Sequence, residues 1–209
     1  MRGSGPTLAY DVAVTSLGPL LLAASERGLV RLVFVPSDGQ VHEEFGRLAI
    51  EREARFVRAP ATLEEALSQV QQYLAGDRHV FVLALDLSGQ PPFTRAVLGA
   101  ASEIPYGETR SYTEVAAAAG RPSAVRATGN ALGANPVPVV LPCHRVLRAG
   151  GQLGGYTGGV AIKRRLLVLE GASVQKADVV DRPVDDLGLA DDVVFGEEGR
   201  RLTVDRPLM

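Results

Sequence analysis

The chain has 209 residues, of which 46% are hydrophobic and 22% charged, and its formal net charge is -2. This composition is not that of a disordered polymer. The sequence holds neither about 18 consecutive apolar residues nor a basic segment followed by an apolar one at its N-terminus, so we expect neither a membrane-spanning helix nor a signal peptide. We therefore expect one large or two small folded domains in a soluble, cytoplasmic protein.

The charge is distributed unevenly along the chain. Residues 1–86 contain 8 Lys or Arg and 11 Asp or Glu, residues 87–171 contain 9 and 4, and residues 172–209 contain 5 and 9. Only the middle region therefore has the net positive charge expected of a nucleic-acid-binding surface. An ordinary solvated domain can carry the same excess, so the charge permits a DNA partner without establishing one.

Three short β-prone segments, separated by turn-forming residues, begin the chain at Leu8–Thr15, Leu20–Ala24 and Leu29–Val35. They predict an antiparallel meander. A further strand is predicted at Val80–Leu87.

One helix is predicted over Thr62–Leu74, where apolar residues recur on a single face. Thr62 and Glu65 have the spacing of an N-terminal capping box, and Gly76 marks the C-terminal end. Residues 1–87 thus form a small α+β domain with one or two helices on a sheet. Because no cluster of catalytic side chains is evident in this domain, we expect its role to be structural.

After a linker at Ser88–Pro92, the chain changes to short, Ala-rich segments typical of helices. The first of these helices is predicted over Phe93–Glu103. Ser111 and Glu114 form a capping box that begins the second helix, which ends at Gly120.

A third helix is predicted from Ser123 to Ala134, and it ends before Pro136 because the residue that precedes a proline is pushed out of helical geometry. The second and third helices, joined by a few residues, are typical of a helix-turn-helix in a domain that spans residues 88–171. Residues 172–209 form an acidic C-terminal extension, whose apolar runs allow either a β-hairpin or a tail without regular structure.

The only cysteine, Cys143, follows an apolar, proline-bounded segment that we interpret as a strand, so its thiol is expected inside the protein. A single cysteine cannot form an internal disulfide, and no Cys/His cluster supplies the four ligands of a structural zinc, so we expect neither a metal nor a cofactor. A buried structural cysteine is one interpretation. A nucleophilic cysteine needs a base, because an unassisted thiol with a pKa near 8.5 is only about 3% thiolate at neutral pH.

His144 is the nearest candidate base. Adjacent residues of an extended segment point to opposite faces, which favours a bridging water over a direct hydrogen bond between Cys143 and His144. A carboxylate would then orient the imidazole, and Glu170, at the end of an apolar helix, can point inward. The other candidates in this domain are Glu103, Glu108 and Glu114.

Four motifs follow one another in the second domain: Ile104-Pro105-Tyr106-Gly107, Pro142-Cys143-His144-Arg145, Gly154-Gly155-Tyr156-Thr157-Gly158-Gly159 and Glu170-Gly171. In order, type and spacing they closely resemble those of the O6-alkylguanine-DNA alkyltransferases. The resemblance implies an α+β fold, in which a ribonuclease-H-like sheet-and-helix domain, matched more weakly here, precedes a mostly helical domain with a helix-turn-helix.

The function implied by this resemblance is direct-reversal repair of double-stranded DNA. A flipped O6-alkylguanine enters a pocket, the thiolate of Cys143 attacks the alkyl carbon, and the protein is inactivated after a single turnover. By resemblance His144 is the base, acting through water, and Glu170 orients it. O4-methylthymine is implied as a further substrate, and the protein is expected to be a monomer that can load cooperatively on DNA.

The resemblance assigns the DNA contacts to the helix-turn-helix. Arg126, at the start of its second helix, is implied to fill the stack vacated by the extruded base, which offsets part of the few kcal/mol that extrusion costs. Tyr112 is implied to help rotate the phosphate and hold the flipped base. The small residues Ala127 and Gly129 let the helix approach the minor groove, where base readout is degenerate.

The substrate pocket is implied to be formed by Tyr156, Thr157, Asn135 and Val146. Tyr156 and Thr157 lie in the Gly-rich loop, and family members more often have serine at position 157, so the rim of the pocket can differ. Asn135 fits a turn whose backbone its side chain can satisfy, which supports the thiol. A phosphate cradle, the other interpretation of a Gly-rich loop, lacks the Gly-Lys-Ser/Thr that should follow.

Two rival functions are distinguishable by experiment. A DNA-binding protein that recognises alkylated bases without repairing them is disfavoured by the presence of Cys143. A cysteine hydrolase usually brings its histidine from a distant part of the sequence and adds an oxyanion hole, neither of which is evident. Multiple turnovers on an ester or a peptide would favour the hydrolase.

Overall fold

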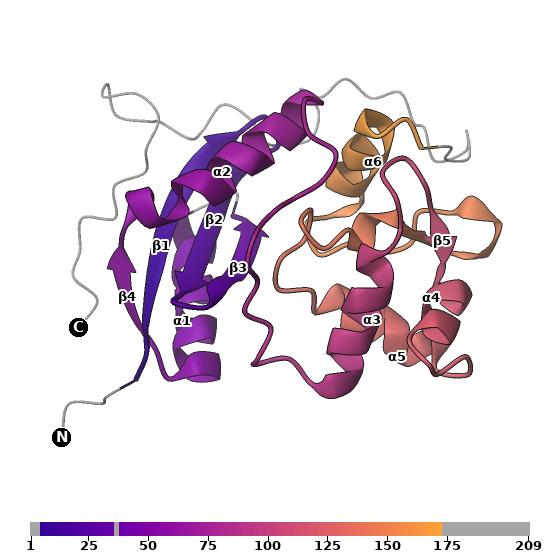
Figure 1. The fold of residues 1–209 in the computed structure, drawn as a ribbon, viewed down its shortest axis with the longest axis horizontal. Helices are drawn as coiled ribbons and strands as arrows, with labels where there is room; N and C mark the ends of the chain where they lie inside the picture. Colours follow the sequence, from indigo (N-terminus) through magenta and orange to yellow (C-terminus); the bar gives the residue numbers. More distant parts are fainter. Residues whose placement is uncertain (1–4, 36–37, 173–209) are drawn as a thin grey trace.

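The computed structural model describes residues 5–35 and 38–172, which form an N-terminal sheet domain and a C-terminal helical domain side by side (Figure 1). The expected α+β class is therefore confirmed. The acidic extension lies outside the described residues, apart from Ala172. No helix in the described ranges is long and apolar enough to cross a membrane.

The N-terminal sheet is built from β1 (Thr7–Thr15), β2 (Gly18–Ser25), β3 (Gly28–Phe34) and β4 (Arg55–Arg58), in the order β3-β2-β1-β4. The first three strands form the antiparallel meander predicted from the sequence, and β4 adds to β1 in parallel.

Both faces of this sheet are covered. Because side chains alternate along a strand, Leu21 packs with α1 (Asp38–Arg52) while Leu20 and Leu22 face α2 (Pro60–Ala75). The sequence analysis left α1 and β4 unassigned. The core contacts of α1 include Val41, Phe45 and Leu48, whose spacing is that of one helix face and was therefore a signal present in the sequence, whereas β4 is only four residues long.

Helix α2 begins at Pro60 rather than at Thr62, so the predicted capping box is wrong. The N-cap is Ala59, which makes no side-chain hydrogen bond, and Pro60 occupies the first turn, where its missing N–H has no helical partner to lose. The predicted end is confirmed, because Gly76 adopts the left-handed conformation with φ 86° and closes the helix.

The strand predicted at Val80–Leu87 is wrong as well. The alternation of half-buried and exposed side chains is present, but the segment forms only an isolated bridge between Leu85 and Leu29. The amide of Gln69 takes the place of a neighbouring strand, since its Oε1 accepts from the Val82 N–H at 2.8 Å and its Nε2 donates to the Val82 carbonyl at 3.0 Å. A side chain thus satisfies the backbone that a ladder would otherwise have paired.

The C-terminal domain consists of short elements: α3 (Pro92–Ser102), β5 (Arg110–Ser111), α4 (Tyr112–Ala118), α5 (Val125–Gly133), β6 (Val146–Leu147) and α6 (Val160–Leu169). Ser111 and Glu114 form the predicted capping box in both directions. Helices α4 and α5 pack against each other as a helix-turn-helix, and α5 begins at Val125, two residues later than predicted.

The segment before Cys143 is not the strand that was predicted. Pro136, Pro138 and Pro142 remove backbone donors from residues 135–142, and Cys143 begins a short 3-10 turn, Cys143–Arg145. Asn135 satisfies part of this backbone instead, since its Oδ1 accepts from Val137 N at 3.0 Å and its Nδ2 donates to the Leu141 carbonyl at 2.8 Å.

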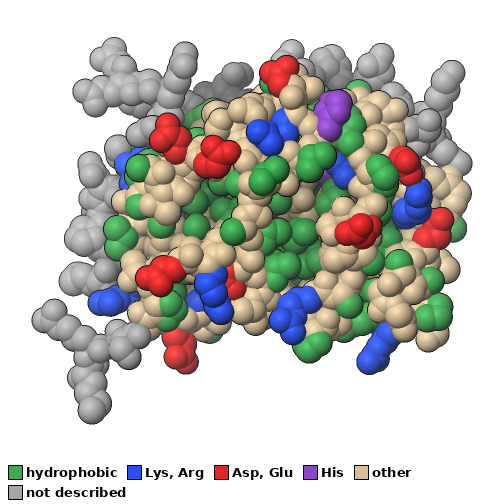
Figure 2. Space-filling model, viewed as in Figure 1, with side chains coloured by type: hydrophobic (Ala, Val, Ile, Leu, Met, Phe, Trp, Pro, Cys, Tyr) green, Lys and Arg blue, Asp and Glu red, His purple; other side chains and the backbone are tan. Residues whose placement is uncertain are grey.

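The two domains share one hydrophobic core. The cluster that holds Leu22 and Val70 of the N-terminal domain continues into Val97, Val137 and Cys143 of the C-terminal domain. Figure 2 shows hydrophobic side chains along the junction, with most charged groups around it. A backbone hydrogen bond of 2.9 Å from N–H of residue 32 in β3 to the carbonyl of residue 136 also crosses the junction, so the segment preceding the cysteine rests on the edge of the sheet.

Candidate active site

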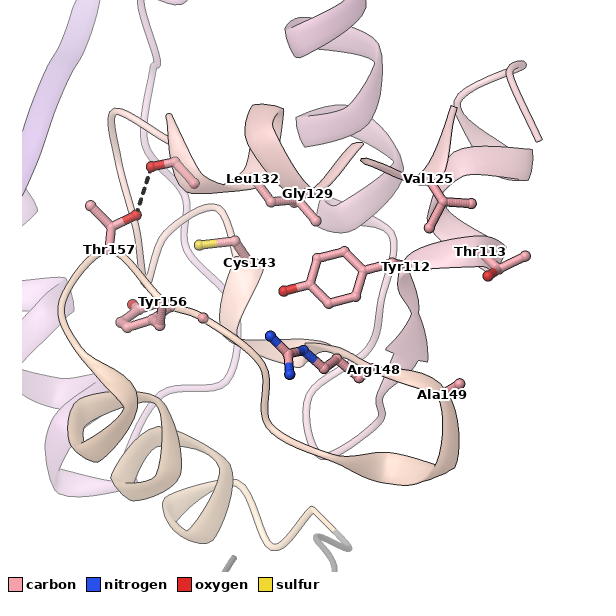
Figure 3. A pocket seen from close by; sticks show the side chains of 12 residues that line it. Tyr112, Thr113, Val125, Gly129, Leu132, Cys143, Arg148, Ala149, Tyr156 and Thr157 are labelled. Atoms are coloured by element: carbon pink, nitrogen blue, oxygen red, sulfur yellow. Dashed lines mark hydrogen bonds between the residues drawn. The ribbon is translucent and has the colours of Figure 1, made fainter. Parts of the chain in front are cut away.

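A cavity of about 610 Å³ opens between the helix-turn-helix and the loops that follow the cysteine. In Figure 3, Tyr112 and Arg148 extend toward Tyr156, and the thiol of Cys143 lies beside them. The residues that line the cavity are Tyr112, Thr113, Val125, Gly129, Leu132, Gly133, Cys143, Arg148, Ala149, Gly155, Tyr156 and Thr157.

Cys143 supplies the thiol that lines this cavity and is its candidate nucleophile. It is 5% exposed, and its sulfur accepts a hydrogen bond of 3.1 Å from Asn135 Nδ2. Burial raises the pKa of the thiol to about 11, while the Asn135 hydrogen bond and the nearby charge of Lys163 act in the opposite direction. The resting side chain is therefore a neutral thiol at neutral pH and needs help to ionise.

His144 is fully buried and adjoins the thiol in sequence. Its Nε2 lies 2.9 Å from Glu170 Oε1 and 3.2 Å from the Tyr73 hydroxyl, whereas its Nδ1 is buried without a hydrogen-bond partner among the described residues. Burial lowers the pKa of His144, and Glu170 works against that shift. A neutral imidazole whose Nε2 carries the proton toward Glu170 leaves Nδ1 as a free acceptor.

Glu170, which follows α6, is the most heavily bonded carboxylate of the site. Arg145 donates from Nε at 3.1 and 3.0 Å and from Nη2 at 2.9 Å, and Gly107 N–H donates at 3.2 Å. Burial alone would raise the pKa of Glu170, but the hydrogen bonds from His144, Arg145 and Tyr73 outweigh it and lower the pKa to about 2. Glu170 is therefore ionised and fixed in orientation at neutral pH.

Three charged or polar residues of the site were not among the sequence predictions. Arg145 and Tyr73 both bind Glu170, and Lys163 is fully buried with its Nζ 2.6 Å from the Val146 carbonyl. Burial lowers the pKa of Lys163 to about 8, and Cys143 opposes that shift. The sequence contained a signal for Lys163, because a lysine on the apolar face of a helix is unusual and indicates a buried charge. Tyr73 gave no such signal, because it has the spacing of an ordinary packing residue of α2.

The predicted DNA contacts fall into two groups. Tyr112 and Gly129 line the cavity, whereas Arg126 and Ala127 lie exposed on α5 outside it. A side chain at Gly154, which has φ 66°, would begin 3.2 Å from the Tyr112 hydroxyl, so this glycine leaves room for the tyrosine. The helix-turn-helix thus supplies both a wall of the cavity and an exposed cation beside it.

The predicted pocket residues are only partly brought together. Tyr156 and Thr157 line the cavity, and the Thr157 hydroxyl donates to the Gly133 carbonyl at 2.9 Å, which ties the Gly-rich loop to α5 (Figure 3). Asn135 is not among the residues that line the cavity, but its side chain donates a hydrogen bond to the sulfur of Cys143. The structure does not place Val146 in the wall, because its side chain faces the core from β6 and is fully buried.

No three His, Cys, Asp or Glu side chains in the described part of the chain lie together as a group that could hold a metal ion.

Both domains match known protein families. Residues 92–172 match the family described as 6-O-methylguanine DNA methyltransferase, DNA binding domain, and residues 8–87 match the ribonuclease-like domain of 6-O-methylguanine DNA methyltransferase. The two matches adjoin at the linker between the sheet domain and α3.

Individual relatives extend this similarity over most of the chain. A methylated-DNA–protein-cysteine methyltransferase of Methanosarcina barkeri is 40% identical over 161 residues, which is 77% of this chain and 96% of that protein. A protein of the same name from Mycobacterium tuberculosis H37Rv is 48% identical over 161 residues, with 77% and 91% covered. The crystal structure of Mycobacterium tuberculosis OGT in complex with DNA superposes with a TM-score of 0.65 at 38% identity, and covers 78% of this chain and 92% of that one.

Proposed function

Because this chain belongs to the 6-O-methylguanine DNA methyltransferase family, we propose that Cys143 is the residue that accepts the alkyl group. The protein repairs DNA by direct reversal, through alkyl transfer to a cysteine, and is a methylated-DNA–protein-cysteine methyltransferase. The observation that carries the assignment is that the only cysteine of the sequence lines the cavity between the helix-turn-helix and the Gly-rich loop.

The reaction is a displacement at carbon. The thiolate of Cys143 attacks the alkyl carbon of O6-alkylguanine, a carbon–sulfur bond forms, and the carbon–oxygen bond breaks. Guanine leaves with the electron pair and takes up a proton. The product thioether has no proton to lose and cannot act again as a nucleophile, so each protein molecule turns over once.

His144 takes the thiol proton in this proposal. A thiol pKa of about 11 makes the thiolate roughly 5 kcal/mol unfavourable at neutral pH, so an acceptor is required. No direct hydrogen bond joins Cys143 to His144 in the described structure, and the free Nδ1 of the imidazole supports transfer through a bridging water. Glu170 holds Nε2 and stabilises the imidazolium that forms.

DNA is the partner of this family's DNA-binding domain, and we propose that α5 enters the minor groove of double-stranded DNA. Ala127 and Gly129 leave the helix backbone accessible, and the exposed Arg126 would fill the gap left by the flipped nucleotide. Tyr112, which lines the cavity, would hold the flipped base. Tyr156 and Thr157 would then form the opposite side of the guanine site.

We further propose a monomeric, cytoplasmic protein that can load cooperatively on DNA and also accepts O4-methylthymine. Sedimentation of the free protein and of its DNA complexes tests the oligomeric state and the loading, and a duplex that carries O4-methylthymine tests the second substrate.

Intact-mass analysis after incubation with a duplex that contains O6-methylguanine tests the function. One methyl group should be added per protein molecule, and peptide mapping should place it on Cys143. Binding without a mass gain would indicate a damage-recognition protein that does not repair. Repeated turnover of an ester or peptide would indicate a cysteine hydrolase.

A further inference from the structure

One tyrosine of the N-terminal domain reaches the site described above. Tyr73 lies in the last turn of α2, three residues before the Gly76 cap, so the end of this helix is directed at the C-terminal domain. The side chain is fully buried, in a cluster that contains Leu17 of the N-terminal domain and Val139, Ile162 and Leu166 of the C-terminal domain.

We call Cys143, His144 and Glu170, through which the proposed proton transfer runs, the relay. The phenol oxygen of Tyr73 contacts two of these three residues. Its hydroxyl donates to Glu170 Oε1, and the oxygen lies 3.2 Å from His144 Nε2. Ring contacts fix its position, because Phe81 lies 5.1 Å away and Tyr106 packs edge-on at 6.0 Å, measured between ring centroids.

Tyr73 acts as a donor throughout the working pH range. Burial and the neighbouring Glu170 charge both raise the pKa of its hydroxyl, so the phenol keeps its proton. It therefore cannot replace His144 as the proton acceptor. It can instead fix the position of Glu170 Oε1, the carboxylate oxygen that also accepts a hydrogen bond from His144 Nε2.

We infer that Tyr73 is a positioning residue for alkyl transfer, through which the N-terminal domain completes the relay of Cys143, His144 and Glu170. The inference rests on the proposed function. With Tyr73 in place, Oε1 is shared between the tyrosine, the imidazole and Arg145, which fixes the carboxylate and limits the negative charge that His144 experiences. Without the hydroxyl, the carboxylate and the imidazole lose one common anchor.

The test compares Tyr73→Phe with Tyr10→Phe in the full-length protein. Both changes remove one phenol oxygen from the N-terminal domain, but Tyr10 packs against Phe45 on the face of the sheet that α1 covers. We expect Tyr73→Phe to lower the first-order rate constant for transfer from bound, methylated duplex by about tenfold. Tyr10→Phe should transfer as the wild type does.

Three further readouts separate positioning from a structural role. The dissociation constant for methylated duplex should be measured in two proteins that cannot react, Cys143→Ala and the double variant Cys143→Ala, Tyr73→Phe. The two values should agree within about twofold. Transfer from free O6-benzylguanine should fall by the same factor as transfer from DNA, since the relay serves both. The pH–rate profile of Tyr73→Phe should shift toward higher pH, because Glu170 then offers more of its charge to His144 and raises its pKa.

Rescue provides a second variant. Tyr73→p-aminophenylalanine, introduced by suppression of a stop codon, restores an N–H donor at the para position of the ring and should recover most of the lost rate. Thermal unfolding of all variants shows whether a loss of rate coincides with a loss of fold.

The inference is overturned if Tyr73→Phe transfers at the wild-type rate with an unshifted pH profile, if Tyr10→Phe loses as much, or if the rescue variant is no faster than phenylalanine. A failure of the wild-type protein to transfer in the same assay would instead refute the proposed function.

Discussion

The two domains meet at Glu170, and they reach it in different ways. From the C-terminal domain the carboxylate receives His144 and Arg145, which adjoin Cys143 in the sequence. Among the described residues of the N-terminal domain, Tyr73 alone forms a hydrogen bond to it, and this residue lies 71 residues from His144 and 97 from Glu170. The proposed catalytic residues Cys143 and His144 stand next to each other in the sequence, whereas the contact from Tyr73 forms only once the chain has folded.

The domains also differ in what their buried polar groups do. In the C-terminal domain these groups surround a thiol and hold an imidazole with one free nitrogen. In the N-terminal domain the buried Gln69 replaces missing backbone partners, as a structural group does. Tyr73 lies one helical turn beyond Gln69 in the same helix, so the structural glutamine and the proposed positioning residue are neighbours in α2.

The largest effect should come from the C-terminal domain. Cys143→Ala removes the sulfur that bonds to carbon, so no methyl transfer should be detectable by intact mass. The affinity for a methylated duplex should change by no more than about twofold, since the thiol is 5% exposed and contacts Asn135 rather than the outer surface. Any methyl group found on the alanine variant would remove Cys143 from its role.

The second largest effect should be a loss of stability in acid, when the hydrogen-bonded carboxylate of Glu170 becomes protonated. The pKa of Glu170 is depressed from 4.5 to about 2, so the carboxylate contributes stability above its unfolded pKa, and this contribution is lost as the pH falls through the window between those values. The loss should amount to about 3 kcal/mol, measured by urea unfolding at a series of pH values.

Glu170→Gln is the control for that window. The variant should be less stable than the wild type at neutral pH, because the buried Arg145 loses its counter-charge, and its stability should fall less between pH 4.5 and 2. Parallel curves for the two proteins would show that other carboxylates govern acid unfolding.

Arg126→Ala should distinguish DNA handling from chemistry. Repair of duplex DNA should slow by about tenfold, because extrusion of the base loses a stacking partner, whereas transfer from free O6-benzylguanine should not change. Arg95→Ala, another exposed arginine of the same domain, serves as the matched control and should leave both rates near the wild type. Equal slowing on both substrates would contradict a role in extrusion.

The elements predicted correctly from the sequence depend on near neighbours. The stop at Gly76 and the capping box at Ser111 and Glu114 are each decided within one turn of helix, and both are confirmed. The meander is likewise set by adjacent segments and the turns between them.

The errors share a different physical origin. Val80–Leu87 has the pattern of a strand, but the partner of its backbone is a glutamine side chain 13 residues away. The segment before Cys143 looked extended, but Asn135 and the prolines shape it into a loop with a positive φ of 76° at Val139. Side-chain-to-backbone bonds of this kind leave no periodic signal in the sequence.

The candidate site divides along the same line. Cys143, His144 and Glu170 belong to motifs whose order and spacing resemble those of a known family, so the sequence predicted that they would lie together. Tyr73 could not be predicted, because its spacing in α2 is that of a core residue and its partners belong to the other domain.

The smallest effect on activity is expected at Gln69, which sharpens the contrast within α2. Gln69→Ala leaves the backbone N–H and carbonyl of Val82 without their partner in a half-buried segment, so the free energy of unfolding should fall by about 2 kcal/mol. The first-order rate constant for methyl transfer at a temperature where the variant is folded should equal that of the wild type.

Gln69→Ala and Tyr73→Phe alter the same helix but should affect different quantities, the first stability and the second the rate of transfer. The first should lower the urea midpoint and leave transfer intact, because its partner is the backbone of Val82, which lies outside the candidate site. The second should slow transfer at a similar or smaller loss of stability, because its partners are Glu170 and His144. If Gln69→Ala slowed transfer as much as Tyr73→Phe does, the end of α2 would act on the site through domain packing as a whole, and the hydroxyl of Tyr73 would have no separate part in it.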